Sequence, residues 1–548
     1  MTDDTGIAFH RPGAFWLGCS LLVAGVLAHM PMFMMGAHMH YRMAGMPMDR
    51  TMLVGMALIP LGLALSAYGL MPRLSQVRRT LDRGNDTSFH IADGVPLNRA
   101  HWTLMAALMV ALAVDVMKPA TLGFVMPGMT SEYAIDTRTG AVLALVALTG
   151  TALGSILWGR LGDVFGRRAA ILLSALMFMG TAICGAMPSF HWNLAMCFLM
   201  GASAGGLLPI AFTLMAETVP SAHRGWLLVA LGGIGTSAGY LLAAGAATWL
   251  EPRFSWRSLW LLGLPTGALI VVLNRWIPES PRFLSHAGLP ERALAVLARF
   301  SGKARTSHAV EPDDAAHPGA ALIDEQHPVA GLRAVLHGRH AAISLGMLVC
   351  GVAWGMVNFG FLLWLPVNLA GLGVDATNAN SLLARSALLA LPGIAITVWL
   401  YQYWSSVRAL VLFIAITLLA LLAFVAVDLL ALRSALATTI ATAALLIGVS
   451  GVIAMLIPYA AEIYPVQLRG TGAGVIAAGS KAGGILGAAL GVVGFFEHVA
   501  LSAALIAVPM GISAVLLLRH GVETRGRRLE DIQSALAGES QPRRKHAD

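Results

Sequence analysis

The sequence predicts an all-α integral membrane protein. Of the 548 residues, 57% are hydrophobic and only 12% are charged, which is too little charge for an ordinary soluble domain. Apolar runs of about 18 to 25 residues recur along nearly the whole chain, and a helix of this length crosses the roughly 30 Å hydrocarbon core of a bilayer. Helices are expected because they satisfy every backbone polar group internally in lipid.

We expect about fourteen transmembrane helices, twelve of them in two six-helix halves. The N-terminal extension, 1–100, holds spans at 13–35 and 51–71. The N-terminal half, 101–277, holds spans at 101–126, 140–158, 169–187, 191–216, 225–249 and 257–277. A cytoplasmic central loop, 278–340, contains a predicted surface helix from Pro290 to Phe300. The C-terminal half, 341–519, holds spans at 341–368, 379–400, 408–428, 435–461, 470–493 and 498–519, and a cytoplasmic tail occupies 520–548.

The positive charges predict how these helices are oriented. Lys and Arg residues gather in alternate loops, and loops of this kind stay in the cytoplasm. We therefore expect both termini in the cytoplasm and the protein in the inner (plasma) membrane. The formal net charge of +8 reflects this topology and does not indicate nucleic-acid binding, because the basic residues are not interleaved with aromatic residues on one face.

Cysteine spacing and missing motifs exclude several kinds of function. The four cysteines all fall in apolar runs without paired spacing, so neither a disulfide framework nor a zinc site is predicted. The chain has no G-x-x-x-x-G-K-[ST] loop, which makes direct coupling to ATP unexpected. We predict a protein that is not an enzyme and needs no cofactor, with a proton gradient as its energy source.

A short charged loop at 159–168 separates two apolar runs. It reads Gly-Arg-Leu-Gly-Asp-Val-Phe-Gly-Arg-Arg. Its glycines permit tight turns, and Asp163 is placed to cap the helix that follows. Many polytopic membrane proteins have Gly/Arg loops because arginines collect on the cytoplasmic side. The spacing of glycine, aspartate and paired arginines is more specific than that.

The chain also contains an internal repeat. Glu217 and Glu462 each precede an arginine by seven residues, and each arginine is followed by glycine. Another glutamate, Glu279 or Glu523, lies about 62 or 61 residues further on. Two similar halves in parallel order follow from this repeat, and such halves can open a central site to each side of the membrane in turn.

Together these motifs resemble the major facilitator superfamily, and in particular its sugar porter and organic-ion transporter branch. The loop at 159–168 is similar to the family's loop between its second and third helices, and the segments 216–225, 278–284, 461–470 and 523–530 are similar to signatures of the branch. The resemblance implies salt bridges at the cytoplasmic helix ends that form a gate. The implied gate residues are Gly159, Asp163, Gly166, Arg167, Arg168, Glu217, Arg224, Glu279, Arg282, Glu462 and Arg469.

The second half departs from this pattern. The counterpart of Asp163 is Arg408, and the glycine and aspartate of the first loop are missing around it. We therefore expect the gate of the C-terminal half to be less strongly latched than that of the N-terminal half.

Four ionisable residues stand out because they lie away from the ends of predicted spans. Asp115 and Lys118 share a face of the third span, while Arg385 and Lys481 lie in the tenth and thirteenth. Charge in hydrocarbon is costly, so such residues are functional candidates. We predict that Asp115 carries the coupling proton and that the three cations bind a carboxylate substrate. The alternatives are a static ion pair between Asp115 and Lys118 and an Arg385 that snorkels to the interface.

The third span adds a family resemblance to this prediction. The segment 115–127 is similar to the first core helix of aromatic-acid and metabolite:proton symporters, in which an intramembrane aspartate is typical. A second acidic residue that is usual in those helices is absent here. Tyr240, Trp354 and Asn358 are further candidates for substrate binding, together with Phe361 and Trp364. Aromatic residues at helical spacing also serve as ordinary packing, which is the alternative.

The loop between the first two spans is rich in methionine and histidine. At 34–49 it contains His38, His40 and several methionines. Thioether and imidazole groups bind copper, but the spacing fixes no coordination geometry. We therefore assign no metal site and leave open that this is only a membrane-surface loop.

These observations predict a secondary active transporter that acts as a monomer in the bilayer. Its expected activity is proton-coupled symport of a small organic acid anion by alternating access. Two other substrate classes stay open, a sugar or polyol and a drug exchanged for protons. A protein of another class, a non-transporting metal or ligand sensor, would use the Met/His-rich loop.

Overall fold

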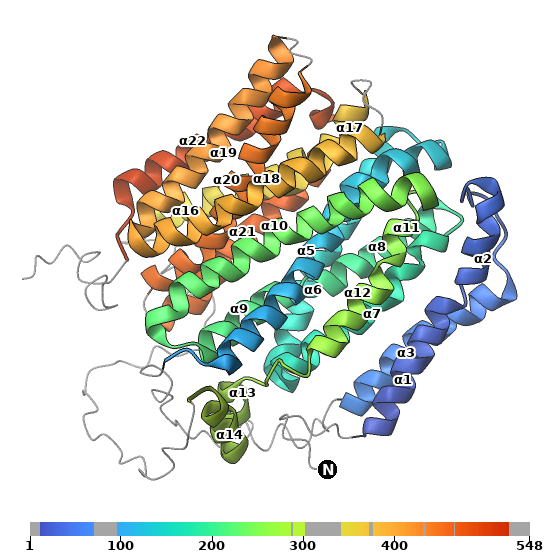
Figure 1. Ribbon diagram of the computed structural model, residues 1–548, viewed down its shortest axis with the longest axis horizontal. Coiled ribbons are helices and arrows are strands. Elements are labelled where there is room, and N and C mark those ends of the chain that lie inside the picture. The colour runs from blue at the N-terminus through green and yellow to red at the C-terminus, as the bar shows by residue number, and fades with distance from the viewer. Residues whose placement is uncertain are drawn as a thin grey trace, which may run out of the picture.

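The computed structural model describes residues 11–70, 96–286, 289–301, 341–371, 376–430, 434–464 and 466–524. Every regular element within these ranges is a helix. Figure 1 shows the two halves lying against each other, with the N-terminal extension beside the first half. The all-α prediction is therefore confirmed.

The described ranges contain twelve helices that are long and apolar enough to cross a membrane. The predicted count of fourteen is not confirmed, because two predicted spans are interrupted. The span at 191–216 is divided into α8 (Phe190–Ala204) and α9 (Leu207–Thr218), and the span at 257–277 contains α11 (Ser258–Leu261) and α12 (Gly263–Leu273). At the first break, a Cβ on Gly205 would lie 2.2 Å from the carbonyl oxygen of Thr151, so only glycine allows this close approach to α6 (Thr137–Phe165).

The N-terminal extension is a tight helical hairpin. Its elements are α1 (Pro12–Leu27), α2 (Met30–Met35), the short helix η1 (Gly36–Met39) and α3 (Arg50–Leu70). A Cβ on Gly18 would lie 2.4 Å from the Ser66 hydroxyl, and one on Gly25 would lie 2.7 Å from the carbonyl oxygen of Gly55. Small residues at such positions let two membrane helices pack backbone to backbone.

The N-terminal half continues from the extension. Besides α8, α9, α11 and α12, its elements are α5 (Arg99–Tyr133), α6 (Thr137–Phe165), α7 (Arg167–Gly180), η3 (Thr181–Ala186) and α10 (Ser221–Phe254). We call the end of the bundle at which α6 gives way to α7 the basic end, and the end at which α5 gives way to α6 the opposite end. Beyond the basic end lie α13 (Pro281–His286) and α14 (Pro290–Ser301). Helix α14 confirms the predicted surface helix, and 302–340 lies outside the described residues.

The C-terminal half has the same order of long helices. Its elements are α16 (Ala341–Met356), the π-helical turn η5 (Val357–Phe361), α17 (Leu362–Gly371), α18 (Ala376–Tyr403), α19 (Ser406–Leu429), α20 (Ala435–Ile463), α21 (Val466–Val492), η6 (Phe495–Glu497) and α22 (Val499–His520). The halves meet where α10 packs on α18 and α20, where α6 packs on α21, and where α5 packs on α17. A central cavity lies between these contacts.

The predicted repeat is visible in how two glutamates cap helices. Glu279 accepts the backbone N–H of Arg167, at 2.7 Å, at the start of α7. Glu523 accepts the backbone N–H of Ser406, at 3.0 Å, at the start of α19. Each carboxylate thus satisfies a backbone donor that the first turn of a helix leaves without a partner, and it lies at the positive end of the helix dipole.

Candidate functional site

The central cavity is lined by both halves of the molecule. Its unfilled space, including the open mouth, is about 1290 Å³. Helices α5, α6 and α10 supply side chains from the first half, and α16, η5, α17, α20 and α21 supply them from the second. The lining is mainly apolar with a few polar side chains, the composition that small-molecule sites share. We take this cavity as the candidate site.

One wall of the cavity carries a buried ion pair. Asp115 lines the cavity from the middle of α5, and the ammonium of Lys118 lies 3.2 Å from its carboxylate. The two residues meet because positions three apart lie on one helix face. The Lys118 ammonium also lies 3.9 Å from the centre of the Phe178 ring on α7. Only 2% of the Lys118 side chain and 7% of the Asp115 side chain are exposed.

A second cation reaches the cavity from the other half. Lys481 on α21 lines the cavity and donates a hydrogen bond of 3.3 Å to the carbonyl oxygen of Gly205. That oxygen is available because α8 has ended at Ala204. An ammonium has three donors, and this bond uses one of them. Lys481 also lies close enough to Asp115 for the two charges to interact.

The other predicted site residues on the cavity wall are polar or aromatic. Asn358 lies in η5, whose π-helical turn interrupts the ninth predicted span. Such turns are often found at functional sites. Trp354 lines the cavity and donates from its indole N–H to the carbonyl oxygen of Val449, at 2.9 Å. Tyr240 packs on Phe124 with 5.8 Å between ring centres, and its buried hydroxyl has no hydrogen-bond partner among the described residues.

The structure does not bring two of the predicted substrate cations to the cavity. Lys118 is not among the lining residues, because its ammonium is enclosed between Asp115 and Phe178. Arg385 is exposed on α18 and is also absent from the lining, which agrees with the snorkelling alternative. Substrate contact by Lys118 and Arg385 is therefore not supported by their placement.

At the basic end, Glu279 links α7 to the segment that follows α12. It is buried, and it accepts N–H bonds from Arg167, Arg168 and Ser280. Burial raises the pKa of the Glu279 carboxyl to about 7, although these bonds and the Arg167 charge oppose the rise. Gly166 has a positive φ of 103°, and a Cβ there would lie 2.4 Å from the Glu279 carboxylate. Only glycine therefore fits at this position of the predicted gate.

The second half has its own contacts at the basic end. Glu462 accepts hydrogen bonds from the Tyr401 hydroxyl at 2.8 Å and from the Thr524 hydroxyl at 2.6 Å. A Cβ on Gly225 of α10 would lie 3.1 Å from the Glu462 carboxylate, so this residue lies at the contact between the halves. Arg224 donates to the carbonyl oxygen of Val219. Gly159 has open space around it.

Part of the predicted gate cannot be placed. The side chains of Asp163, Glu217, Arg282 and Arg469 lie outside the described residues. Sequence reasoning missed Ser405 and Ser406, which donate hydrogen bonds to Glu523. Serine hydroxyls near Arg408 thus contact the glutamate of the second half, while the weaker latch of that half stays a prediction. The repeat relates the start of α19 at Ser406 to the start of α7 at Arg167. This relation is the sequence signal that could have indicated a capping contact there.

Two contacts at the opposite end also join the halves and were not predicted. Arg138 at the start of α6 is 3.1 Å from Glu497 of η6. Asn380 of α18 donates to Glu251 of α10 at 2.5 Å. Neither pair belongs to a repeated motif, so nothing in the sequence pattern indicated them.

The Met/His-rich loop is used for packing and hydrogen bonding. Met43 is buried, and the backbone N–H groups of Met43 and Ala44 donate to the carboxylate of Glu132. His38 and His40 are exposed. Among the described residues, no three His, Cys, Asp or Glu side chains form a group that could hold a metal ion.

Comparison with known proteins identifies relatives over most of the chain. The niacin transporter NiaP of Acinetobacter baylyi is 26% identical over 80% of this chain and 98% of its own length. The 4-hydroxybenzoate transporter PcaK of Pseudomonas putida is 25% identical over 76% of this chain and 90% of its own. The gallate transporter of Pseudomonas putida is 25% identical over 78% and 94%.

Solved structures with the same fold include the xylose transporter XylE from E. coli in a partially occluded inward-open conformation. The TM-score is 0.63, with 14% sequence identity over 79% of this chain and all of that one. A second likeness, with a TM-score of 0.62 and 16% identity, is to the proton:xylose symporter XylE bound to 6-bromo-6-deoxy-D-glucose, over 80% of this chain and 99% of that one. At this identity the likeness concerns the fold alone.

The family model of the Major Facilitator Superfamily matches residues 103–488. The match includes the cavity residues and most of both halves, and it leaves the N-terminal extension outside. The chain therefore belongs to the Major Facilitator Superfamily and is a membrane transporter, not an enzyme.

Proposed function

We propose that this protein is a proton-coupled symporter that carries a small, single-ring organic acid anion by alternating access. The observation that carries the proposal is that one cavity holds an acid from the first half, Asp115, and an ammonium from the second, Lys481. Both halves therefore hold a charged group at the site, and a bound anion would contact both. We propose no cofactor and no metal in this cycle.

The formal charges around the cavity explain how a proton and an anion can be coupled. With Asp115 ionised, the cations of Lys118 and Lys481 leave one net positive charge. Protonation of Asp115 raises this to two, so the cavity then attracts a carboxylate more strongly. By thermodynamic linkage, a bound anion favours protonation to the same extent. This reciprocity is what a symporter requires.

The walls of the cavity and the relatives support an aromatic acid as the substrate class. Phe124, Tyr240, Trp354 and Phe359 provide flat apolar surface, and Asn358 provides an amide for a polar ring substituent. The relatives named above are transporters of niacin, 4-hydroxybenzoate and gallate. Each of these compounds is a single ring that carries a carboxylate. The sugar alternative rests on likeness of fold alone.

We propose the following order of events. Asp115 takes a proton from the opposite end, the substrate carboxylate binds against Lys481, and the halves rock so that the cavity opens toward the basic end. Loss of the proton there weakens anion binding and releases the substrate. The basic end faces the cytoplasm of an inner-membrane protein, as the loop arginines predict.

The experiment is uptake by proteoliposomes that hold the purified protein under an imposed pH gradient. Nicotinate, 4-hydroxybenzoate, gallate and xylose are supplied separately. We expect uphill accumulation of at least one aromatic acid, with Arg385→Gln as a matched control that removes a cation outside the cavity and leaves uptake unchanged. Accumulation of xylose without any of the acids would overturn the substrate class.

A further inference from the structure

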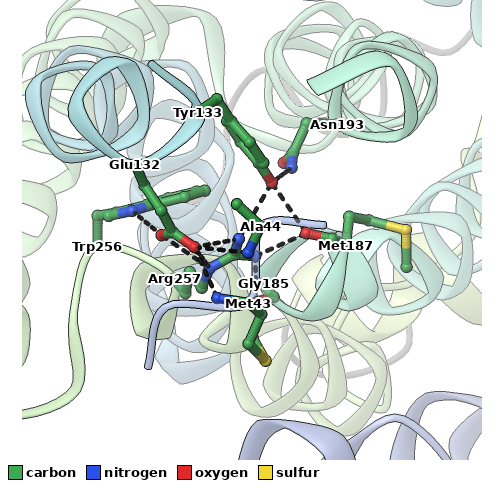
Figure 2. Close-up of polar contacts among 9 residues, drawn as sticks. All are labelled: Met43, Ala44, Glu132, Tyr133, Gly185, Met187, Asn193, Trp256 and Arg257. Carbon is green, nitrogen blue, oxygen red and sulfur yellow. Dashed lines mark hydrogen bonds and ion pairs between the residues drawn. The ribbon is translucent and has the colours of Figure 1, made fainter. Parts of the chain in front are cut away.

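The N-terminal extension lies outside the family match and has no part in the proposed cycle, yet it is bonded to the helix that carries Asp115. Its loop reaches the opposite end of the N-terminal half (Figure 2). There the Glu132 carboxylate, at the end of α5, accepts the backbone N–H of Met43 at 2.7 Å and that of Ala44 at 3.1 Å. Gly45 adds a bond from its N–H to the carbonyl oxygen of Pro188, at 2.9 Å.

Glu132 is held in a dense polar cluster. Arg257 lies 2.7 Å from its carboxylate, and the Trp256 indole N–H donates to it at 2.9 Å. The side chains of Arg257 and Glu132 are only 0% and 5% exposed. Arg257 also donates to the carbonyl oxygen of Met187 at 2.7 Å, and the Tyr133 hydroxyl donates to the same oxygen at 2.8 Å. Figure 2 shows these groups converging on Glu132 and Arg257. The carboxylate is therefore a fixed anchor for the loop.

The loop is joined at both of its ends to a hairpin that packs on the N-terminal half. The hairpin of α1 and α3 packs through glycines, as described above, and it also packs on α7. A Cβ on Gly180 of α7 would lie 2.7 Å from the side chain of Ile59 on α3. The hairpin thus stays with the N-terminal half, and its loop can hold the end of α5 in place.

The helical ladder of α5 is weakened between Asp115 and this end. Pro119 and Pro127 lie inside the helix between Asp115 and Glu132, and each removes a hydrogen bond of the helical ladder. Gly123, between the two prolines, lies against α17, where a Cβ would be 2.5 Å from the carbonyl oxygen of Leu363. Gly123 and Leu363 both line the cavity. This part of α5 therefore packs on the second half at the wall of the cavity.

We propose that the extension positions the opposite-end part of α5, with Glu132 as the positioning residue, and so limits how readily the cavity opens toward that end. The inference rests on the proposed alternating access but not on the identity of the substrate. A loop that only stabilised the fold would leave this opening unchanged.

The test uses the full chain with a reporter cysteine at Ala120, which lines the cavity from α5. The four native cysteines are buried, so they contribute little background. A small, membrane-impermeant thiol reagent is added to intact cells, where it reaches the end that faces outside. The labelling rate then measures opening toward the opposite end and needs no substrate, so it can succeed or fail independently of the transport assay.

Two variants release the contact in different ways. Ala44→Pro removes one N–H donor at an exposed position and leaves the pair of Glu132 and Arg257 intact. Glu132→Gln weakens the anchor itself. Asp136→Asn is the matched control, because it removes a negative charge four residues away that caps α6 and does not contact the loop.

We expect both release variants to raise the labelling rate about tenfold, which corresponds to about 1.4 kcal/mol, and Asp136→Asn to leave it unchanged. In inside-out vesicles, where the basic end is accessible, the same variants should not raise the rate. Unchanged labelling of Ala44→Pro and Glu132→Gln in cells, with or without a loss of thermal stability, would overturn the proposal. If Glu132→Gln does not fold, Ala44→Pro alone decides.

Discussion

The Lys481 ammonium donates a hydrogen bond of 3.3 Å to the carbonyl oxygen of Gly205, and this bond joins the two halves at the wall of the cavity. The same oxygen accepts the hydroxyl of Ser155 at 2.7 Å. A backbone carbonyl has two lone pairs, so this one is fully used. The Lys481 ammonium keeps two further donors, which a substrate carboxylate could accept in charge-assisted hydrogen bonds. The bond to Gly205 would therefore position Lys481 while it holds an anion at the contact between the halves.

The first prediction concerns the charge at position 481. Lys481→Gln keeps a hydrogen-bond donor but removes the cation, so we expect the affinity for an accepted aromatic acid to fall about tenfold to a hundredfold, the range for a hydrogen bond to a charged group. Lys481→Arg should retain most of it. Ligand-induced thermal shifts over a concentration series measure the affinities. Equal affinity of Lys481→Gln and the wild type would remove Lys481 from the site.

The second prediction separates coupling from exchange. Asp115→Asn cannot take up or release a proton, so accumulation driven by a pH gradient should be lost. Exchange of labelled for unlabelled substrate at equal concentrations should continue, because it needs no net proton movement. Proteoliposome uptake and counterflow measure the two activities side by side. Uphill uptake that survives in this variant would refute the coupling role.

Much of the fold was predictable from the sequence because it depends on local and repeated features. The apolar runs predicted the long helices, and the spacing of glutamates and arginines predicted two similar halves. The break between α8 and α9 was not predictable, because it depends on how closely Gly205 approaches Thr151 of another helix. Hydropathy continues through this break, so the sequence alone shows one span.

The candidate site was predictable in part, because charged residues within apolar runs are visible in the local sequence. Asp115 and Lys481 stand out as charges within apolar runs, and both line the cavity. Lys118 and Arg385 give the same signal from sequence, but one is paired within its own helix and the other faces outward. Which side of a helix faces a cavity depends on packing between helices. The contacts of Glu132 with the extension loop join residues almost 90 positions apart with no repeated motif.

The third prediction tests the close approach at Gly205. A Cβ there would lie 2.2 Å from the Thr151 carbonyl oxygen, so Gly205→Ala must push α6 and α8 apart. We expect a loss of stability of about 1–3 kcal/mol, typical of overpacking, together with weaker anion binding because the acceptor of Lys481 moves. Gly245→Ala is the control, since a Cβ at that helical position meets open space. Thermal unfolding in detergent compares the two, and equal midpoints would contradict the packing argument.

The fourth prediction concerns Glu279 and pH. Burial raises its pKa to about 7, above the ordinary value of about 4.3 for an unfolded chain. Between these values the folded state holds a proton that the unfolded state has lost. The contribution of Glu279 to stability is therefore fully present below about pH 4.3 and is lost as the pH rises through about 7. Glu279→Gln should flatten this fall.

Melting temperatures at several values between pH 5 and 8 measure the effect, with Glu497→Gln as the comparison. The pKa of the exposed Glu497 is lowered by its bond with Arg138, so its contribution is lost only as the pH falls below about 4.3 and stays constant between pH 5 and 8. A stability curve for Glu279→Gln that parallels the wild type would show that this carboxyl does not titrate in the range.

The most direct test of the account is proton uptake on substrate binding. The central claim is that an anion bound near Lys481 and a proton on Asp115 favour each other across one cavity. Purified protein in weakly buffered detergent, with a pH-sensitive dye, is mixed with an aromatic acid that thermal shift has shown to bind. We predict that the wild type takes up protons as the ligand saturates and that Asp115→Asn binds the ligand without a pH change. Binding to the wild type with no proton uptake, or equal uptake by Asp115→Asn, would contradict the claim.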